Sequence, residues 1–185
     1  VDGRIGWLLV LSAAPAGVVG VLFKDQIDEL DDIWMIAVML IVGGFALLIA
    51  DRLPGRRPLD DFRWRDALLM GAGQALALQP GVSRSGATLT VARAVGFERD
   101  AAARLVFLMS LPIIAGAGVF ALADVTVPSE FWPPFLAGMA ASAITGWLAV
   151  WGTLKLVRNH TFLPFVVYRV LLGVFVLVIL AAGWR

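Results

Sequence analysis

The chain has 185 residues, of which 60% are hydrophobic and 16% charged, with a formal net charge of +1. This composition, with a mean hydropathy of +0.87, is far more apolar than that of a soluble domain, and no basic cluster with interleaved aromatics indicates nucleic-acid binding. The absence of cysteine and the presence of a single histidine exclude disulfides, thiolate chemistry and metal sites built from several Cys or His ligands.

Five apolar runs are long enough to cross a bilayer core, which takes about 20 helical residues. Their approximate bounds are Ile5–Phe23, Ile33–Ala50, Leu105–Ala123, Phe131–Leu154 and Phe162–Trp184. The sequence therefore predicts an all-α, polytopic integral membrane protein, with residues 1–185 forming a single transmembrane domain.

The loops differ in charge, and this asymmetry predicts a sixth membrane element. Loop 24–32 is acidic, whereas loop 51–66 and the stretch 93–104 are rich in arginine, which places the arginine-rich segments on the cytoplasmic side. Segment 67–92 then has both ends on that side, yet its 26 residues are too few for two full spans. We therefore expect a re-entrant helical hairpin over about 67–92.

The tip of this predicted hairpin carries the run Gln79-Pro-Gly-Val-Ser-Arg-Ser-Gly-Ala-Thr88. An ionisable side chain at that depth indicates a functional site, and these residue types suit a phosphate group. Arg84 can bind phosphate oxygens in a bidentate manner, hydroxyls can donate hydrogen bonds, and glycines allow backbone N–H groups to approach an anion. The predicted catalytic residues are Arg84 and Ser83, and the predicted diphosphate contacts are Gly81, Ser85, Gly86, Thr88 and Gln74.

Each of these residues also has a structural interpretation. Arg84 could pair backbone carbonyls at the tip, and the three hydroxyl residues could cap a half-helix, a role compatible with phosphate contact. Gln74 could equally serve helix packing. Arg169, seven residues into the last span, is interpreted mainly as an anchor that snorkels to the cytoplasmic face.

These motifs resemble the bacterial undecaprenyl-diphosphate phosphatases, the bacitracin-resistance family. The resemblance lies in the run Gln74–Thr88, in the Pro15-Ala-Gly-Val-Val-Gly stretch and in Phe165-Val-Val-Tyr-Arg169 of the last span. It implies a multi-pass enzyme of the bacterial plasma (inner) membrane, with inverted repeats, that hydrolyses undecaprenyl diphosphate to the monophosphate. Its implied partners are the polyprenyl diphosphate lipid and the bilayer, and an oligomer is compatible with it.

The chain departs from the family pattern at its beginning. Family members carry an earlier Glu-rich motif followed by a Pro-Val-Ser-Ser-x-Gly-His string, and neither occurs here. We therefore expect the chain to correspond to the C-terminal two-thirds of a family member, and to be inactive alone. The resemblance implies a divalent cation, Mg²⁺ or Ca²⁺. Because no Asp or Glu lies within an apolar run, we expect no metal ligand in this chain and place those ligands in the earlier segment.

Two other functions fit the same pattern. A re-entrant hairpin near the middle of the membrane is also transporter architecture, so the chain could belong to a lipid-diphosphate flippase or transporter. A non-catalytic membrane partner is the second alternative.

Overall fold

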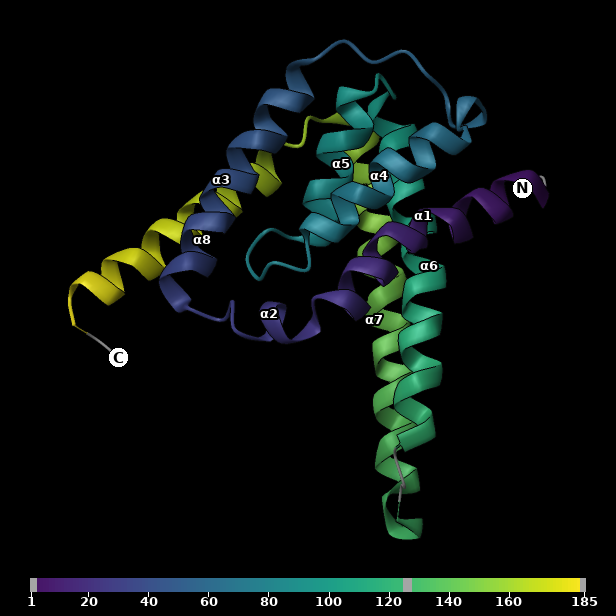
Figure 1. Ribbon diagram of the computed structural model, residues 1–185, viewed down its shortest axis with the longest axis vertical. Coiled ribbons are helices and arrows are strands. Elements are labelled where there is room, and N and C mark those ends of the chain that lie inside the picture. Colours follow the sequence, from purple (N-terminus) through teal and green to yellow (C-terminus); the bar gives the residue numbers. More distant parts are fainter. Residues whose placement is uncertain (1–2, 125–127, 184–185) are drawn as a thin grey trace.

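The computed structural model describes residues 3–124 and 128–183 (Figure 1). Within them the chain is helical, and its only β-pairing is an isolated bridge between Arg57 and Phe97. The elements are α1 (Gly3–Leu22), α2 (Lys24–Asp28), α3 (Ile33–Arg52), η1 (Leu59–Asp61), α4 (Trp64–Leu76), α5 (Arg84–Ala94), α6 (Arg99–Asp124), η2 (Ser129–Phe131), α7 (Trp132–Asn159) and α8 (Leu163–Ala181).

Five of these helices, α1, α3, α6, α7 and α8, are long and apolar enough to cross a membrane. They match the five predicted spans, so the prediction of an all-α polytopic membrane protein is confirmed. Helix α6 begins at Arg99, six residues before the predicted run, because Asp100 suits a helix N-terminus and alanines follow it. Trp184, the last residue of the fifth predicted run, lies outside the described residues.

Between α3 and α6 lie two helices that are too short to span a bilayer. Helix α4 has 13 residues and α5 has 11, so they are about 20 Å and 17 Å long, against a hydrocarbon core of about 30 Å. They are joined by residues 77–83 and form a hairpin whose outer ends lie at the same end of the molecule (Figure 1). This is the geometry expected for the predicted re-entrant segment.

Arg57 holds the outer ends of this hairpin together. Its backbone N–H donates to the Gly96 carbonyl at 3.0 Å, and its own carbonyl accepts from the Glu98 N–H at 3.0 Å. Its guanidinium stacks 4.3 Å from the Phe97 ring centre and forms a bidentate ion pair with Asp66, in the first turn of α4, at 2.9 and 2.6 Å. The hydrogen bonds that Arg57 donates to the Asp66 carboxylate raise the pKa of Arg57.

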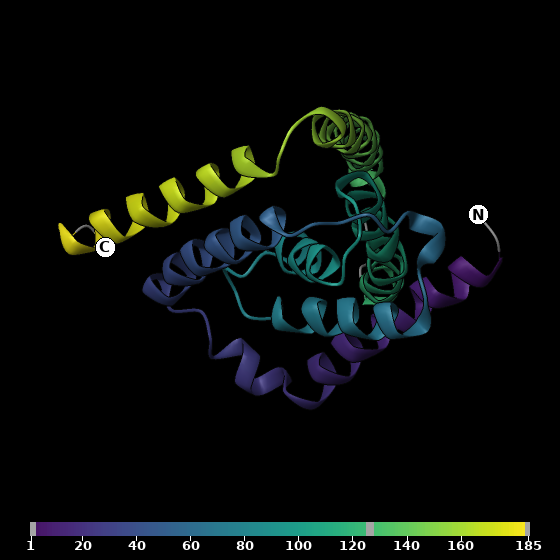
Figure 2. The same ribbon diagram turned by 90° about the horizontal axis from the view of Figure 1, so that it is seen from above.

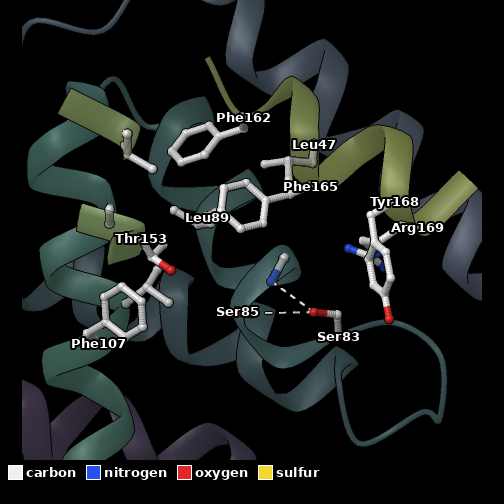
Figure 3. A pocket seen from close by; sticks show the side chains of 14 residues that line it. Leu47, Ser83, Ser85, Leu89, Phe107, Thr153, Phe162, Phe165, Tyr168 and Arg169 are labelled. Atoms are coloured by element: carbon white, nitrogen blue, oxygen red, sulfur yellow. Dashed lines mark hydrogen bonds between the residues drawn. The ribbon is translucent and has the colours of Figure 1, made fainter. Parts of the chain in front are cut away.

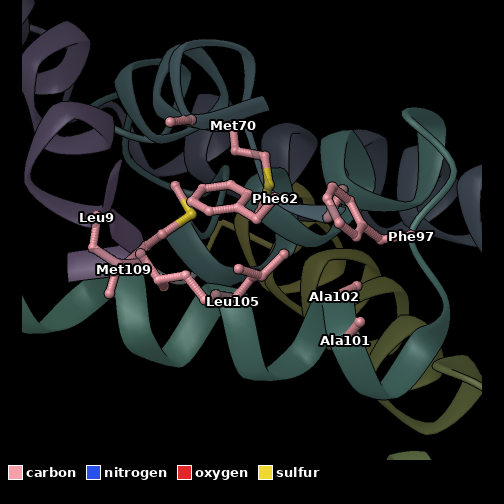
Figure 4. Packing of buried hydrophobic residues seen from close by; sticks show 12 residues of the cluster. Leu9, Phe62, Met70, Phe97, Ala101, Ala102, Leu105 and Met109 are labelled. Atoms are coloured by element: carbon pink, nitrogen blue, oxygen red, sulfur yellow. The ribbon is translucent and has the colours of Figure 1, made fainter. Parts of the chain in front are cut away.

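Two apolar clusters fix the helices around the hairpin. The larger one packs α4 and α5 against α1 and α6 and is centred on Phe62, Met70, Phe97, Leu105 and Met109, all fully buried (Figure 4). The smaller one joins α3, α6, α7 and α8 and consists of Leu47, Ala103, Val157, Phe162 and Val166. Helix α8 lies alongside α3, whereas α6 and α7 run together on another side of the hairpin (Figures 1 and 2). The hairpin is therefore enclosed by helices from both halves of the chain.

The re-entrant topology can be tested by cysteine labelling, because the native chain contains no cysteine. Arg56 and Glu98 are exposed and flank the two outer ends of the hairpin, whereas the exposed Glu130 lies between α6 and α7. We expect Arg56→Cys and Glu98→Cys to resist an impermeant thiol reagent added outside intact cells, and Glu130→Cys to react. Labelling of Glu98→Cys without labelling of Arg56→Cys would show that the segment crosses the membrane.

Candidate functional site

The tip of the hairpin is built on two residues with left-handed backbone. Gly81 has φ +89° and Ser83 has φ +65°, which makes Ser83 the only non-glycine residue with positive φ in the described part of the chain. A Cβ at Gly81 would collide with the Ile36 carbonyl of α3, so only glycine fits there. The strained conformation at Ser83 costs of order 1–3 kcal/mol and is typical of functional sites.

Ser83 is also the N-cap of α5. Its Oγ accepts a hydrogen bond from the Gly86 N–H at 3.3 Å and lies 3.4 Å from the Ser85 Oγ. The first turn of a helix has N–H groups with no helical acceptor and carries partial positive charge. The predicted capping role of Ser83 is confirmed, and the cap places two hydroxyls beside the positive end of α5.

A second cation comes from α8. Arg169 is only 6% exposed, and its Nη2 donates to the Val82 carbonyl at 2.6 Å and to the Gly81 carbonyl at 3.3 Å. Its guanidinium passes between Gly43 of α3 and Gly86 of α5, where a Cβ on either glycine would collide with it. The interpretation of Arg169 as a snorkelling anchor is therefore wrong, because the side chain points at the hairpin tip.

Part of the Arg169 guanidinium has no partner within the described structure. Its Nε and Nη1 are buried and make no hydrogen bond. A buried guanidinium without a counter-charge is costly, so such donors are expected to serve a ligand. A phosphate oxygen that reached these atoms would satisfy them.

A cavity of about 300 Å³ adjoins these groups. At one end it is lined by Ser83, Ser85, Gly86, Tyr168 and Arg169, and elsewhere it is mostly apolar, with the rings of Phe107, Phe162 and Phe165 and the side chain of Leu89 (Figure 3). The remaining lining residues are Leu47, Ala103, Val106, Thr153 and Val157. The cavity is therefore amphipathic, with its donors gathered at one end.

The polar end lies about halfway along a membrane-spanning helix. A Cβ at Gly43 would lie 3.1 Å from the Val82 carbonyl oxygen, so the tip of the hairpin is level with this residue. Gly43 is ten residues, or about 15 Å, from the start of the 20-residue helix α3. The Ser83–Arg169 pair is thus level with the middle of α3, and its depth in the membrane stays a prediction.

The other predicted site residues are not all at the cavity. Gln74 is 3% exposed and donates to the Ser12 carbonyl of α1 at 3.3 Å, which favours its packing interpretation. The Thr88 hydroxyl is buried and donates to the Arg84 carbonyl at 2.8 Å within α5. The Arg84 side chain is exposed and does not line the cavity. Contacts of these residues with a diphosphate stay predictions.

The cavity does not by itself fit a divalent cation. Its lining residues include no carboxylate, and no group of three or more His, Cys, Asp or Glu that could hold a metal occurs in the described residues. The two buried carboxylates of this part of the chain, Asp51 and Asp66, are bound to arginines. We therefore assign no chemical step to a metal held by these residues.

Fold and site together define a polytopic, all-α membrane protein with an amphipathic cavity at the tip of a short helical hairpin, whose hydrogen-bond donors are gathered at one end. The chain belongs to the family described as Bacitracin resistance protein BacA, which matches residues 1–175.

Similar proteins cover nearly all of the chain. It is 42% identical to the undecaprenyl-diphosphatase of Nocardioides sp. over 98% of the chain and 68% of the relative's length. It is 45% identical to the undecaprenyl-diphosphatase of Desulforudis audaxviator over 96% of the chain and 69% of that relative. The undecaprenyl-diphosphatase of Elusimicrobium minutum is 43% identical over 96% of the chain and 68% of that relative. The sequence resemblance to the bacitracin-resistance family is thus confirmed.

Proposed function

We propose that the protein is an undecaprenyl-diphosphatase of the bacterial plasma (inner) membrane. It hydrolyses undecaprenyl diphosphate to undecaprenyl phosphate and inorganic phosphate, which recycles the cell-wall lipid carrier and confers bacitracin resistance. The observation that carries the proposal is the amphipathic cavity, whose polar end holds a buried guanidinium with unpartnered N–H groups. A lipid diphosphate has the same division into anionic and hydrocarbon parts.

The polar end suits the charge that develops during the reaction. Water attacks the terminal phosphorus, the phosphoanhydride bond breaks, and its electron pair remains on the bridging oxygen of the departing undecaprenyl phosphate. Arg169 Nη1 and Nε, together with the N-terminus of α5, would stabilise the negative charge on the phosphoryl oxygens. Because Arg169 already donates to Val82, its position is set before the substrate arrives.

Ser83 is assigned to the phosphoryl group. Its hydroxyl lies at the positive end of α5, and its Oγ already accepts from Gly86, so its proton is free to be donated to a phosphate oxygen. Ser85 offers a second hydroxyl 3.4 Å away. We assign both residues to holding the diphosphate in line for attack.

The apolar part of the cavity is assigned to the hydrocarbon next to the diphosphate. Phe107 of α6 and Phe162 and Phe165 at the start of α8 present aromatic rings to it (Figure 3). Such walls exclude water and strengthen the electrostatic interactions at the polar end. A cavity of this size holds only the first isoprene units, so the rest of the chain would lie in the bilayer.

We also propose that catalysis uses a divalent cation, Mg²⁺ or Ca²⁺. Its carboxylate ligands would have to come from residues other than those that line this cavity. The roles assigned to Arg169, Ser83 and Ser85 do not depend on that ion.

The proposed function is tested by reconstituting the full-length protein in liposomes that contain undecaprenyl diphosphate. We expect release of inorganic phosphate and formation of undecaprenyl phosphate, in amounts that rise with the amount of protein. A flippase would move a fluorescent lipid diphosphate between leaflets without releasing phosphate. A non-catalytic partner would do neither, and either result would overturn the proposal.

A further inference from the structure

A buried carboxylate that does not line the cavity joins the helices that build it. Asp51, in the last turn of α3 and 6% exposed, accepts from the Arg99 Nε at 2.6 Å and from the Phe162 N–H at 3.2 Å. The Arg93 Nε lies 3.8 Å from the same carboxylate. We call Asp51, Arg93, Arg99 and the Phe162 N–H the Asp51 cluster.

The backbone of α3 strengthens these connections. The Asp51 carbonyl accepts from the Arg93 Nη2 at 3.2 Å and from the Arg99 Nη2 at 3.3 Å. Arg93 also donates to the carbonyls of Leu53 and Phe97. The end of α3, the end of α5, the start of α6 and the start of α8 are thereby held at one point.

Two of these helices carry the groups that face each other at the site. Phe162 immediately precedes α8, and Arg169 follows it by seven residues, or about 10 Å along the helix. Arg93 is in the last turn of α5, about 15 Å from the Ser83 cap at the other end. A helix is stiff over such distances, so an axial shift at the Asp51 cluster would be transmitted to the site.

A second contact between α3 and α8 lies at the site itself. Gly43 and Gly44 allow close approach there, since a Cβ at Gly44 would lie 3.1 Å from the Val170 Cγ2 and 3.7 Å from the Arg169 Cβ. Gly43 precedes Asp51 by eight residues, or about 12 Å. The register of α8 on α3 is thus set at the C-terminal end of α3 by a charged hydrogen bond and at the site by close packing.

We infer that Asp51 is a positioning residue for the reaction, which acts by setting the place of Arg169 relative to Ser83. The inference rests on the proposed function for its kinetic test only. Asp51 does not line the cavity, so it acts through Phe162 and the start of α8.

The sharpest variant is Asp51→Asn, because it keeps the size of the side chain. Each oxygen of the carboxylate accepts from a separate donor, with Oδ1 facing Arg99 and Oδ2 facing the Phe162 N–H. An amide in either orientation would set its NH₂ group against one of these donors. The α8 connection or the Arg99 connection must therefore be lost.

Asp66→Asn is the matched control. The side chains of Asp51 and Asp66 are 7% and 8% exposed, and each accepts from an arginine and from a backbone N–H. Asp66 serves the base of α4, however, and none of its contacts involves α8. Both substitutions thus disturb the hairpin surroundings, but only Asp51→Asn changes a side chain that is hydrogen-bonded to the start of α8.

The kinetic test is a double-mutant cycle in the full-length protein, with Arg169→Gln as the second substitution. We expect Asp51→Asn alone to lower kcat about 10- to 100-fold with a smaller change in KM, because a misplaced catalytic group costs about this much. In the Arg169→Gln background, Asp51→Asn should lower kcat by less than about threefold. Asp66→Asn should change kcat by the same factor in the wild-type protein and in the Arg169→Gln variant. An equal cost of Asp51→Asn in both backgrounds would overturn the inference.

A second readout requires no activity. Arg169 is buried, so it should react slowly with phenylglyoxal, and its modification can be followed by mass spectrometry of the peptide. Asp51→Asn should raise the rate at Arg169 at least threefold, and Asp66→Asn should not. If Asp51→Asn elutes as an aggregate, Asp51→Glu replaces it in both tests, because its longer side chain keeps the charge but moves the oxygen away from the Phe162 N–H.

The two readouts separate failure of the inference from failure of the proposed function. Wild-type protein that releases no phosphate would contradict the function, and the labelling of Arg169 would then decide the role of Asp51 alone. Arg169 labelled at the wild-type rate in a well-folded Asp51 variant would overturn the inference whatever the activity.

Discussion

Substitution of Arg169 by glutamine is expected to reduce phosphate release from undecaprenyl diphosphate by about 10²- to 10³-fold, which is the usual cost of losing one preorganised donor to a developing oxyanion. Its Nε and Nη1 are the buried donors without a partner at the polar end of the cavity. Arg169→Lys is also expected to lose most activity, because an ammonium cannot donate to Val82 and to two phosphate oxygens in the same geometry. The measurement is phosphate release from the full-length protein in liposomes.

The control for this prediction is Arg104→Gln. Arg104 is an arginine of α6 whose ion pair with Asp100 lies on the surface, with a side chain that is 42% exposed. Exposed ion pairs contribute little, so this variant should keep near-normal turnover. All variants should first elute as single species in detergent. Wild-type turnover in well-folded Arg169→Lys would show that Arg169 has no role in the reaction.

The fold was predictable because the membrane imposes strict lengths. The five spans follow from runs of about 20 apolar residues, and the short helix pair follows from charged loops on one side and 26 residues between them. The cap at Ser83 was predictable as well, because a hydroxyl residue before a short helix is a local signal. These features depend only on residues that are close together in the sequence or on the length of a segment.

The orientation of Arg169 was not predictable in the same way. A side chain seven residues into a span can reach the cytoplasmic face or the site, and the sequence around it is the same in both cases. The choice is made by Gly43 and Gly86, which leave space for the guanidinium and lie 126 and 83 residues away in the chain. The same limit applies to Asp51, whose burial depends on arginines 42 and 48 residues away.

For Gln74, the sequence left substrate contact and helix packing equally open. The structure gives it a hydrogen bond to Ser12 of α1, and Gly71 one turn earlier lets α1 approach so closely that a Cβ there would meet the Ser12 carbonyl. The small residue and the amide together form a helix–helix contact. An amide near a functional motif is therefore not by itself evidence of substrate contact.

Arg84→Lys is expected to lower turnover by about 10²-fold, although Arg84 and Arg169 occupy different positions in the structure. Arg84 is the first residue of α5 and is exposed, so its guanidinium is able to approach a diphosphate that enters beside Ser83 and Ser85. A diphosphate carries more negative charge than one guanidinium neutralises, and a second one from the opposite side would bind the remaining oxygens in a bidentate manner. A lysine keeps the charge but cannot reproduce that pair of hydrogen bonds.

The hydroxyl variants provide the comparison for Arg84. Arg84→Ala should be at least as impaired as Arg84→Lys, whereas Ser83→Ala and Thr88→Ala should each cost less. Ser83 provides one hydroxyl among several donors that water can replace, and the Thr88 hydroxyl is engaged with the Arg84 carbonyl inside α5. Because Arg84 is exposed in the free protein, its substitution should raise KM as well as lower kcat. Arg169 is already held in place, so its substitution should mainly lower kcat. Wild-type turnover in Arg84→Lys, together with loss in Arg169→Lys, would place phosphate binding on α8 and the Ser83 cap alone.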